Sequence, residues 1–337
     1  LRTLGFRLIF AVIYVLLSTS LLTGFLIKNP KSLHQMLKII GNYFLGIFLY
    51  TLVIILLADF GRILLKYVFH ASWIHSRTAF TVAGTICALL ILLLSACGIF
   101  HAKYIKTTSY DVIINKTIPK HTSMKVVLLA DTHFGYNAGV LHARELVRKI
   151  NKQKPDLVCI AGDIFDNEYD AVRDPEKLEK TLRGIKSTYG VYACWGNHDL
   201  NEEILAGFTF KHKDGDLSDI KDPRMKKFLE DSNIHILEDE SVLINDQFYV
   251  IGRKDASLTE KIDETRKAPA QLTEKLDRDK PIIMIDHQPK ELQELADAGV
   301  DLDLCGHTHN GQTFPGNFTI KLMWENPCGL LIKDNMT

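Results

Sequence analysis

Hydrophobic positions follow two different patterns along this chain of 337 residues. Near the N-terminus they form three long runs without a charged residue, at about 8–27, 39–58 and 78–100. At 1.5 Å per residue, each run can span the roughly 30 Å of bilayer hydrocarbon as a helix. A cleaved signal peptide is the alternative for the first run, but that run is longer than a signal core and two more follow it. The pattern therefore predicts a membrane region over residues 1–107 with three transmembrane helices.

Residues 108–337 show short apolar runs that alternate with amphipathic stretches, which predicts an α/β domain. Six runs predict buried strands that end in polar residues: KVVLLADTHFG, PDLVCIAGDIFD, VYACWGNHD, FYVIGRKD, PIIMIDHQP and DLDLCGHTHNG. Four stretches predict helices, at 139–153, 174–186, 222–231 and 289–299. The segment YDVII at 110–114 predicts another strand, and residues 207–222 predict an inserted surface loop.

The formal net charge of zero conceals an asymmetry between the two parts. Residues 1–123 hold 12 of the 40 basic residues and only two of the 40 acidic ones, Asp59 and Asp111. The remainder therefore carries 28 bases and 38 acids. Basic flanks suit anionic lipid headgroups, whereas an acidic domain repels a polyanion, which disfavours nucleic acid as a partner.

The membrane orientation rests on the charges that flank the helices. Basic residues are equal in number on the two sides, so the positive-inside rule gives a tie. Arg2 and Arg7 precede the first helix and favour an N-terminus inside the cell. With three helices, that orientation predicts a multi-pass protein of the cell membrane whose domain at 108–337 lies outside the cytoplasm.

Polar side chains with metal-binding chemistry follow five of the predicted strands. They are carboxylates, imidazoles and one amide: Asp131, His133, Asp163, Asp166, Asn197, His198, His287, His307 and His309. Because the carboxyl ends of strands in α/β sheets meet at one edge, we expect these side chains to converge in one crevice. Each residue alone is more typical of a helix cap or a core histidine, but the joint set favours a site for divalent ions. The number of ligands suits two ions that share a bridging carboxylate.

The motifs DTH, GDIFD, GNHD, DHQP and GHTH, in that order, resemble those of the calcineurin-like metallophosphoesterase family over residues 124–312. The sequence GHTHNGQ together with a membrane anchor is similar to the bacterial membrane-associated phosphoesterases. The resemblance implies that residues 108–337 form a four-layer sandwich of two mixed β-sheets flanked by helices. It replaces the single doubly wound sheet that the strand pattern alone suggests.

The resemblance also implies roles for the candidate residues. It assigns seven metal ligands: Asp131, His133 and His309 for one ion, Asn197, His287 and His307 for a second, and Asp163 as the bridge. The two divalent ions would be Mn, Fe or Zn. Such a pair holds a hydroxide and clamps the phosphoryl oxygens for in-line attack. His198 would protonate the leaving oxygen, and Asp166 would orient His198.

These assignments predict a membrane-anchored phosphoesterase, with phosphodiesterase activity favoured. Three hydrophobic helices are an elaborate anchor for an enzyme of diffusing substrates, so a lipid-linked phosphoester of the membrane or envelope is the first candidate substrate. Soluble nucleotides or phosphomonoesters are the alternative. A non-catalytic scaffold of the same fold is a second alternative, but scaffolds typically lose ligands and no expected position is replaced here. Nothing in the sequence indicates a protein partner.

Three charged residues near the motifs are left outside the predicted site. Asp199 is interpreted as the cap of a following helix. Arg253 and Lys254 follow a predicted strand and are interpreted as a solvated rim.

The C-terminal segment departs from the family pattern. Members usually continue past the GHTH loop with strands that complete the second sheet, whereas this sequence ends at Thr337. We therefore expect a truncated chain or a small second sheet, with an exposed sheet edge.

Overall fold

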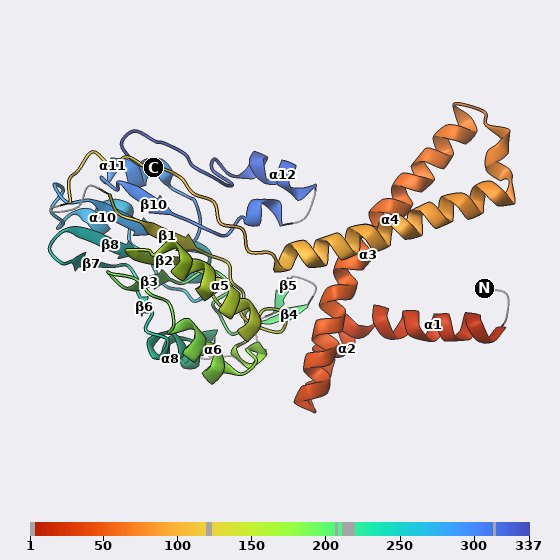
Figure 1. Cartoon of the computed structure of the whole chain (residues 1–337), viewed down its shortest axis with the longest axis horizontal. Helices are drawn as coiled ribbons and strands as arrows, with labels where there is room; N and C mark the ends of the chain where they lie inside the picture. The colour runs from red at the N-terminus through yellow and green to blue at the C-terminus, as the bar shows by residue number, and fades with distance from the viewer. Residues whose placement is uncertain (1–3, 119–122, 206–207, 211–219, 313–314) are drawn as a thin grey trace. The chain divides into compact units, whose positions relative to one another are not determined.

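The computed structural model describes residues 4–118, 123–205, 208–210, 220–312 and 315–337. Its internal contacts divide the chain into two compact units. Unit 1 contains Leu1–Lys106 and Ile204–Thr209, and unit 2 contains Thr107–Glu203 and Phe210–Thr337 (Figure 1). Most of the surface loop predicted at 207–222 lies outside the described residues.

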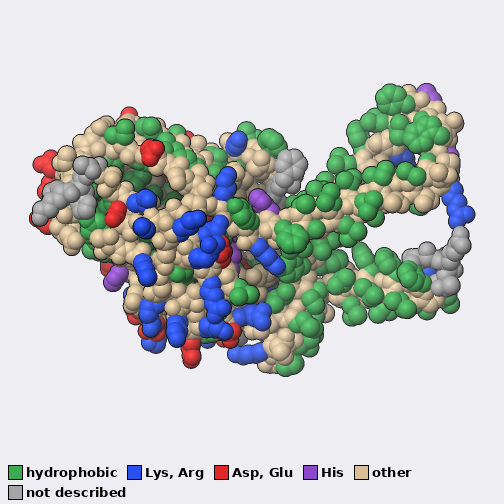
Figure 2. All heavy atoms as spheres, viewed as in Figure 1, with side chains coloured by type: hydrophobic (Ala, Val, Ile, Leu, Met, Phe, Trp, Pro, Cys, Tyr) green, Lys and Arg blue, Asp and Glu red, His purple; other side chains and the backbone are tan. Residues whose placement is uncertain are grey.

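Unit 1 is built from the helices of the membrane region: α1 (Leu4–Ser18), α2 (Ser20–Leu26), α3 (Lys31–Tyr67), η1 (Ser72–His75) and α4 (Arg77–Lys103). α3 and α4 are each long and apolar enough to cross a membrane, and almost none of the residues in their apolar stretches is buried. Figure 2 shows hydrophobic side chains along the surface of these helices. α1 and α2 pass the same test only as a pair, which is bent by 48°. Two apolar helices thus support membrane association, and the third predicted span is a bent pair of shorter helices.

The chain reverses between α3 and α4 at η1. Lys38, near the start of α3, is buried, and its Nζ donates a hydrogen bond to the carbonyl oxygen of Ile204 at 3.0 Å. Ile204 belongs to β4 (Glu203–Leu205). This contact therefore holds β4 against α3 within unit 1.

Unit 2 contains two four-stranded sheets. The first has the order β1 (Val126–Leu129), β2 (Leu157–Ala161), β3 (Val191–Cys194), β6 (His235–Ile236), and its neighbouring strands are parallel. The second has the order β10 (Leu302–Leu304), β9 (Ile282–Ile285), β8 (Phe248–Gly252), β7 (Glu240–Ile244). β7 and β8 are antiparallel and the other neighbours are parallel, so the second sheet is mixed. All six predicted strands are present.

The two sheets pack face to face around one core. Leu157 and Cys159 of β2 join Phe248 of β8 and Ile283 of β9 in a single buried cluster. Alternate residues of each strand supply this core because successive side chains point to opposite faces of a sheet. The packing agrees with the two-sheet sandwich that the family resemblance implied, and the α/β class is confirmed.

Helices cover the outer faces of both sheets. α5 (Val140–Gln153) lies across the first sheet in Figure 1 and buries one apolar stripe. On the other side, Leu272 of α10 and Leu295 of α11 pack against Met284 of β9. The described α-helices of unit 2 also include α6 (Pro175–Leu182), α8 (Pro223–Asp231), α9 (Ala256–Lys261), α10 (Pro269–Thr273), α11 (Leu292–Asp297) and α12 (Gly316–Met323). The four predicted helices correspond to α5, α6, α8 and α11.

The segment that enters unit 2 differs from its prediction. Residues 110–114 belong to no described sheet, and Ile113 is 86% exposed, so the predicted strand is wrong. An ion pair holds this segment against the rest of unit 2: Lys116 Nζ lies 2.7 Å from Asp301 Oδ2. Ile118 then packs against the core between the sheets.

The C-terminal residue lies along the edge strand β10. The carbonyl oxygen of Thr337 accepts the N–H of Asp303 at 2.9 Å, and the Thr337 N–H donates to the Asp301 carbonyl at 3.0 Å. Thr337 therefore covers part of the sheet edge that the sequence led us to expect as exposed.

Candidate metal centre

The predicted ligands lie in loops at the carboxyl ends of five strands, three from the first sheet and two from the second. β1, β2 and β3 lead into the loops with the aspartates and the asparagine, and β9 and β10 lead into the histidine loops. Because the two sheets share one core, these loops meet at one end of the sandwich. The structure brings together all seven predicted ligands: Asp131, His133, Asp163, Asn197, His287, His307 and His309.

One group of ligand atoms comes from Asp131, His133, Asp163 and His309, and these atoms all lie within 4.8 Å of one another. The Nε2 atoms of His133 and His309 are 3.3 Å apart. His133 Nε2 lies 3.8 Å from Asp163 Oδ2, and His309 Nε2 lies 3.7 Å from Asp131 Oδ1. The group thus offers two imidazole nitrogens and two carboxylate oxygens to one metal ion.

A second group comes from Asp163, His287 and His307, whose ligand atoms also lie within 4.8 Å of one another. His287 Nε2 lies 3.1 Å from Asp163 Oδ2 and 3.2 Å from His307 Nδ1. The same nitrogen lies 3.1 Å from Oδ1 of Asn197. Asp163 is the one residue that belongs to both groups of described side chains.

The chemistry of this cluster fits a divalent cation. His287 Nδ1 faces the carbonyl oxygen of Ala161 at 2.8 Å, so Nδ1 carries the hydrogen and Nε2 is the nitrogen that faces the cluster. Three acceptors surround Nε2 at 3.1 to 3.2 Å, and a single proton could serve only one of them. Imidazole, carboxylate and amide oxygen together are typical ligands of Mn, Fe and Zn.

Electrostatics keeps most of the ligands in the form that binds metal. Burial lowers the pKa of His133 and of His307 to about 4, so both rings are neutral at pH 7. Burial acts against the ionised form of Asp163, but its contact with His287 and the neighbouring histidines hold the carboxyl pKa below its usual value. Burial also favours neutral His287, yet Asp163 raises the His287 pKa to about 10. A metal ion would compete with this proton for Nε2.

The ligand loops turn sharply where the strands end. Five of the seven ligands have a left-handed backbone: Asp131 (φ 54°), His133 (φ 42°), Asp163 (φ 51°), His307 (φ 72°) and His309 (φ 48°). This conformation costs a non-glycine residue about 1 kcal/mol or more. The residue before Asp163 is Gly162, at φ 73°, where a Cβ would lie 2.7 Å from Nδ1 of His287. The close approach of β2 to His287 therefore requires glycine at this position.

His198 lies beside the ligands and has a partner that the sequence did not indicate. Its backbone N–H donates to Asp163 Oδ1 at 2.7 Å, and its ring centroid is 5.2 Å from that of His133. Its Nδ1 lies 2.5 Å from Oδ1 of Asn167, which is fully buried. Burial lowers the pKa of His198. Asp166, the predicted orienting carboxylate, has its Oδ1 3.8 Å from Nδ1 of His133.

Asp199 connects two ligand loops, and its interpretation as a helix cap is wrong. The chain after Asp199 leads into β4, not into a helix. The Asp199 carboxylate accepts the N–H groups of Phe165 and Gly196, both at 2.8 Å. These bonds join the loop that carries Asp163 to the loop that carries Asn197. Asp199 is therefore a positioning residue of the centre.

Arg253 is buried, so its interpretation as a solvated rim is also wrong. Its side chain is 1% exposed, and its guanidinium lies 3.2 Å from Oδ2 of Asp286. Asp286 directly precedes the ligand His287 in the chain. Lys254, in contrast, forms an ion pair with Glu264 at 2.7 Å.

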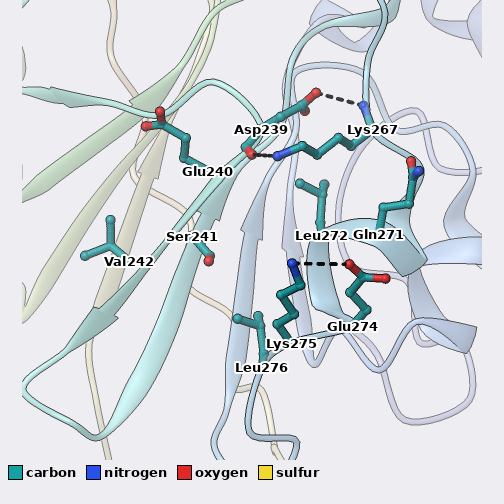
Figure 3. A pocket seen from close by; sticks show the side chains of 10 residues that line it. All are labelled: Asp239, Glu240, Ser241, Val242, Lys267, Gln271, Leu272, Glu274, Lys275 and Leu276. Atoms are coloured by element: carbon teal, nitrogen blue, oxygen red, sulfur yellow. Dashed lines mark hydrogen bonds and ion pairs between the residues drawn. The ribbon is translucent and has the colours of Figure 1, made fainter.

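A separate open cavity of about 560 Å³ lies between β7 and α10, and none of the predicted ligands lines it (Figure 3). Within it, Lys267 Nζ donates to the carbonyl oxygen of Asp239 at 3.0 Å. Lys275 Nζ lies 4.0 Å from Glu274. Both lysines of the cavity thus have a partner within it, and the predicted ligands lie elsewhere, so we assign the chemistry to the ligand loops.

Residues 124–311 match the family model of the calcineurin-like phosphoesterases. This region makes up more than half of the chain and contains every predicted ligand. This chain belongs to that family. The resemblance seen in the sequence motifs is confirmed. Members of this family use divalent metals, which agrees with the clustering of the predicted ligands.

Curated relatives of this chain include bacterial and animal proteins. An uncharacterized metallophosphoesterase of Helicobacter pylori is 29% identical over 59% of this chain and 48% of its own length. A transmembrane protein with metallophosphoesterase domain of Bos taurus is 26% identical over 64% of this chain and 47% of its own. The UDP-2,3-diacylglucosamine pyrophosphatase LpxG of Chlamydia trachomatis is 23% identical over 64% of this chain and 75% of its own length. The chain thus spans about half the length of the first two relatives, and the transmembrane relative supports membrane association.

Proposed function

We propose that this phosphoesterase is a membrane-anchored hydrolase of phosphate esters that uses two divalent metal ions. The position of Asp163 carries the proposal. Its carboxylate belongs to both groups of ligand atoms, and the two groups share no other residue. A carboxylate placed in this way can bridge two ions ~3.5–4 Å apart.

The ligand loops would hold the ions, and the ions would polarise the phosphoryl oxygens and activate water near neutral pH. We assign the first ion to Asp131, His133 and His309, the second to Asn197, His287 and His307, and the bridge to Asp163. The neutral rings of His133 and His307 support this assignment, because a protonated imidazole does not bind metal.

We assign proton donation to the leaving oxygen to His198. Its Nδ1 faces Asn167, so Nε2 is the nitrogen available to a substrate. Asn167 would orient the ring, and Asp166 remains our predicted second partner of His198. A positioned acid of this kind contributes on the order of 10² to 10⁴ in rate.

We propose a lipid-linked phosphodiester as the substrate class. The apolar helices α3 and α4 support a location at the membrane. The name of the relative LpxG, a pyrophosphatase of a diacylated glucosamine nucleotide, supports a lipid-linked substrate. The short segment between α4 and the catalytic domain also favours a substrate in the bilayer. Residues 104–115 separate α4 from the contact at Lys116, and they extend over roughly 40 Å at most.

Metal content tests the shared ligand. The full chain in detergent, loaded with Mn²⁺, should bind about two ions. Asp163→Asn should lose more metal than His309→Ala, because Asp163 contributes to both groups and His309 to one. Asp246→Asn, at an aspartate whose side chain is 82% exposed, is the matched control. Equal metal content in all four proteins by elemental analysis would reject the dinuclear centre.

A side-by-side activity assay tests the substrate. The full chain in lipid vesicles is given a lipid phosphodiester and a soluble aryl phosphodiester, and we expect both to be hydrolysed. Efficient hydrolysis of the soluble ester alone would favour the alternative of a soluble substrate.

A further inference from the structure

The helix α12, which follows the loop with His307 and His309, lies outside the core. None of its residues is buried. Leu322 is 88% exposed, Met323 is 75% exposed, and Phe318 is 60% exposed. In Figure 1, α12 lies apart from α10 and α11, the helices that cover the second sheet. These three large apolar side chains are therefore largely exposed.

Both ends of α12 are nevertheless held against the metal-ligand loop. At its start, Gly316 approaches Gly311 so closely that a Cβ on Gly311 would lie 2.3 Å from the Gly316 carbonyl carbon. At its end, the ring of Trp324 meets that of His307 edge-on, with centroids 5.1 Å apart. The hydroxyl of the residue after His307 donates to the carbonyl oxygen of Pro327. The exposed side chains are thus fixed beside a ligand and do not belong to a loose tail.

The composition of this segment suits a lipid interface. Residues 310–324 contain no acidic side chain and one basic side chain, Lys321. Lys290 Nζ lies 5.4 Å from the ring centroid of Trp324. Exposed aliphatic side chains next to tryptophan and lysine are typical of helices that lie in the headgroup region. The ammonium groups complement anionic lipids.

The same chain contains a candidate membrane-spanning helix close in sequence to the domain that carries α12. α4 is apolar enough to span a membrane and ends at Lys103. Unit 2 begins at Thr107, four residues after α4 ends. A short segment of chain thus joins the domain that carries α12 to a helix apolar enough to span a membrane.

We propose that α12 and Trp324 contact the bilayer and hold the mouth of the metal centre against anionic lipid. Leu322 and Met323 insert at the level of the headgroups, and Trp324 and Lys290 lie between lipid and ligands. A phosphoester in a lipid headgroup then reaches the metal ligands without leaving the membrane. This inference rests on the proposed hydrolase function and specifies how its lipid substrate is presented.

Fluorescence quenching tests the contact in the full chain, reconstituted in vesicles that contain anionic phospholipid. Leu322→Cys carries an environment-sensitive dye, and Leu141→Cys, at a leucine that is 79% exposed on α5, is the matched control. Serine replaces the exposed Cys97 and Cys328 in both proteins. Lipids with a shallow nitroxide should quench the dye at 322 at least about twofold more than the dye at 141, because only the former lies in the interface.

Equal quenching at both positions would overturn the proposal, whether water, a second copy or another segment of the protein covers α12. A second variant, Leu322→Asp, opposes insertion by its charge. It should lower the ratio of lipid-ester to soluble-ester hydrolysis roughly tenfold, the equivalent of one leucine no longer buried. An unchanged ratio would also overturn the proposal. Quenching does not require turnover, so strong quenching without hydrolysis of any ester would keep the membrane contact and reject the hydrolase.

Discussion

The substitution Asp199→Asn turns one oxygen of a buried carboxylate into an NH₂ group and leaves the shape of the side chain unchanged. The two oxygens now accept the N–H groups of Phe165 and Gly196, both at 2.8 Å. Asparagine can accept only one of them, and the other N–H would face an amide donor. A buried N–H without an acceptor costs ~1–3 kcal/mol. Burial raises the pKa of Asp199 to about 7, so removing the charge offsets part of this loss.

We therefore expect the free energy of unfolding to fall by about 1–2 kcal/mol in Asp199→Asn. Because Asp199 joins the loops of Asp163 and Asn197, metal affinity should also fall. Loss of a residue that positions metal ligands typically lowers metal affinity by roughly 10 to 100-fold. The assays are thermal unfolding and metal titration of the full chain in detergent.

Asp301→Asn is the matched control for this variant. Asp301 is also a buried carboxylate, and it accepts the N–H of Ile282 at 2.7 Å. It lies at the start of β10, at the opposite end of the strand from the ligand loop. It should lower stability and leave metal affinity unchanged. If Asp199→Asn lost stability but bound metal as tightly as the wild type, the positioning role of Asp199 would be refuted.

His198→Ala should keep its bound metal and lose on the order of 10² to 10⁴ in rate for esters with poor leaving groups, with a much smaller loss for nitrophenyl esters. Equal losses for both kinds of ester in steady-state assays would contradict the acid role of His198. Burial and the nearby carboxylate of Asp286 raise the pKa of Asp303 from 3.8 to about 7. The stability contributed by protonated Asp303 is therefore complete below pH 3.8 and is lost as the pH rises toward 7. Asp303→Asn should remove this decline in thermal unfolding between pH 4 and 8, and a curve parallel to that of the wild type would show that other groups cause it.

The strands and their ligands could be predicted from the sequence because both have local signals. Leu157–Ala161 is a continuous apolar run that is buried along its whole length, and Asp163 follows it after one glycine. A strand is harder to predict when its formation depends on a neighbouring strand that is far away in the sequence. The alternating residues 110–114 have the composition of a strand, yet no described sheet offers them a neighbour.

The positioning residues could not be predicted because their roles depend on contacts far away in the chain. Asn167 contacts His198 from a different loop, and nothing in its immediate neighbours distinguishes it from a surface asparagine. Asp199 stands where a helix cap would also stand. Arg253 follows a strand as a rim residue would, and only its ion pair with Asp286 explains its burial.

The left-handed backbone at five of the seven proposed ligands means that selection for stability would act against the proposed centre. Glycine adopts this conformation without steric strain, so a glycine at any of these positions would relieve roughly 1 kcal/mol. Laboratory evolution for heat resistance alone would therefore favour variants that discard ligands one by one. In a family alignment, loss of the aspartates and histidines to glycine at these turns would be the expected signature of relatives that kept the fold and abandoned hydrolysis.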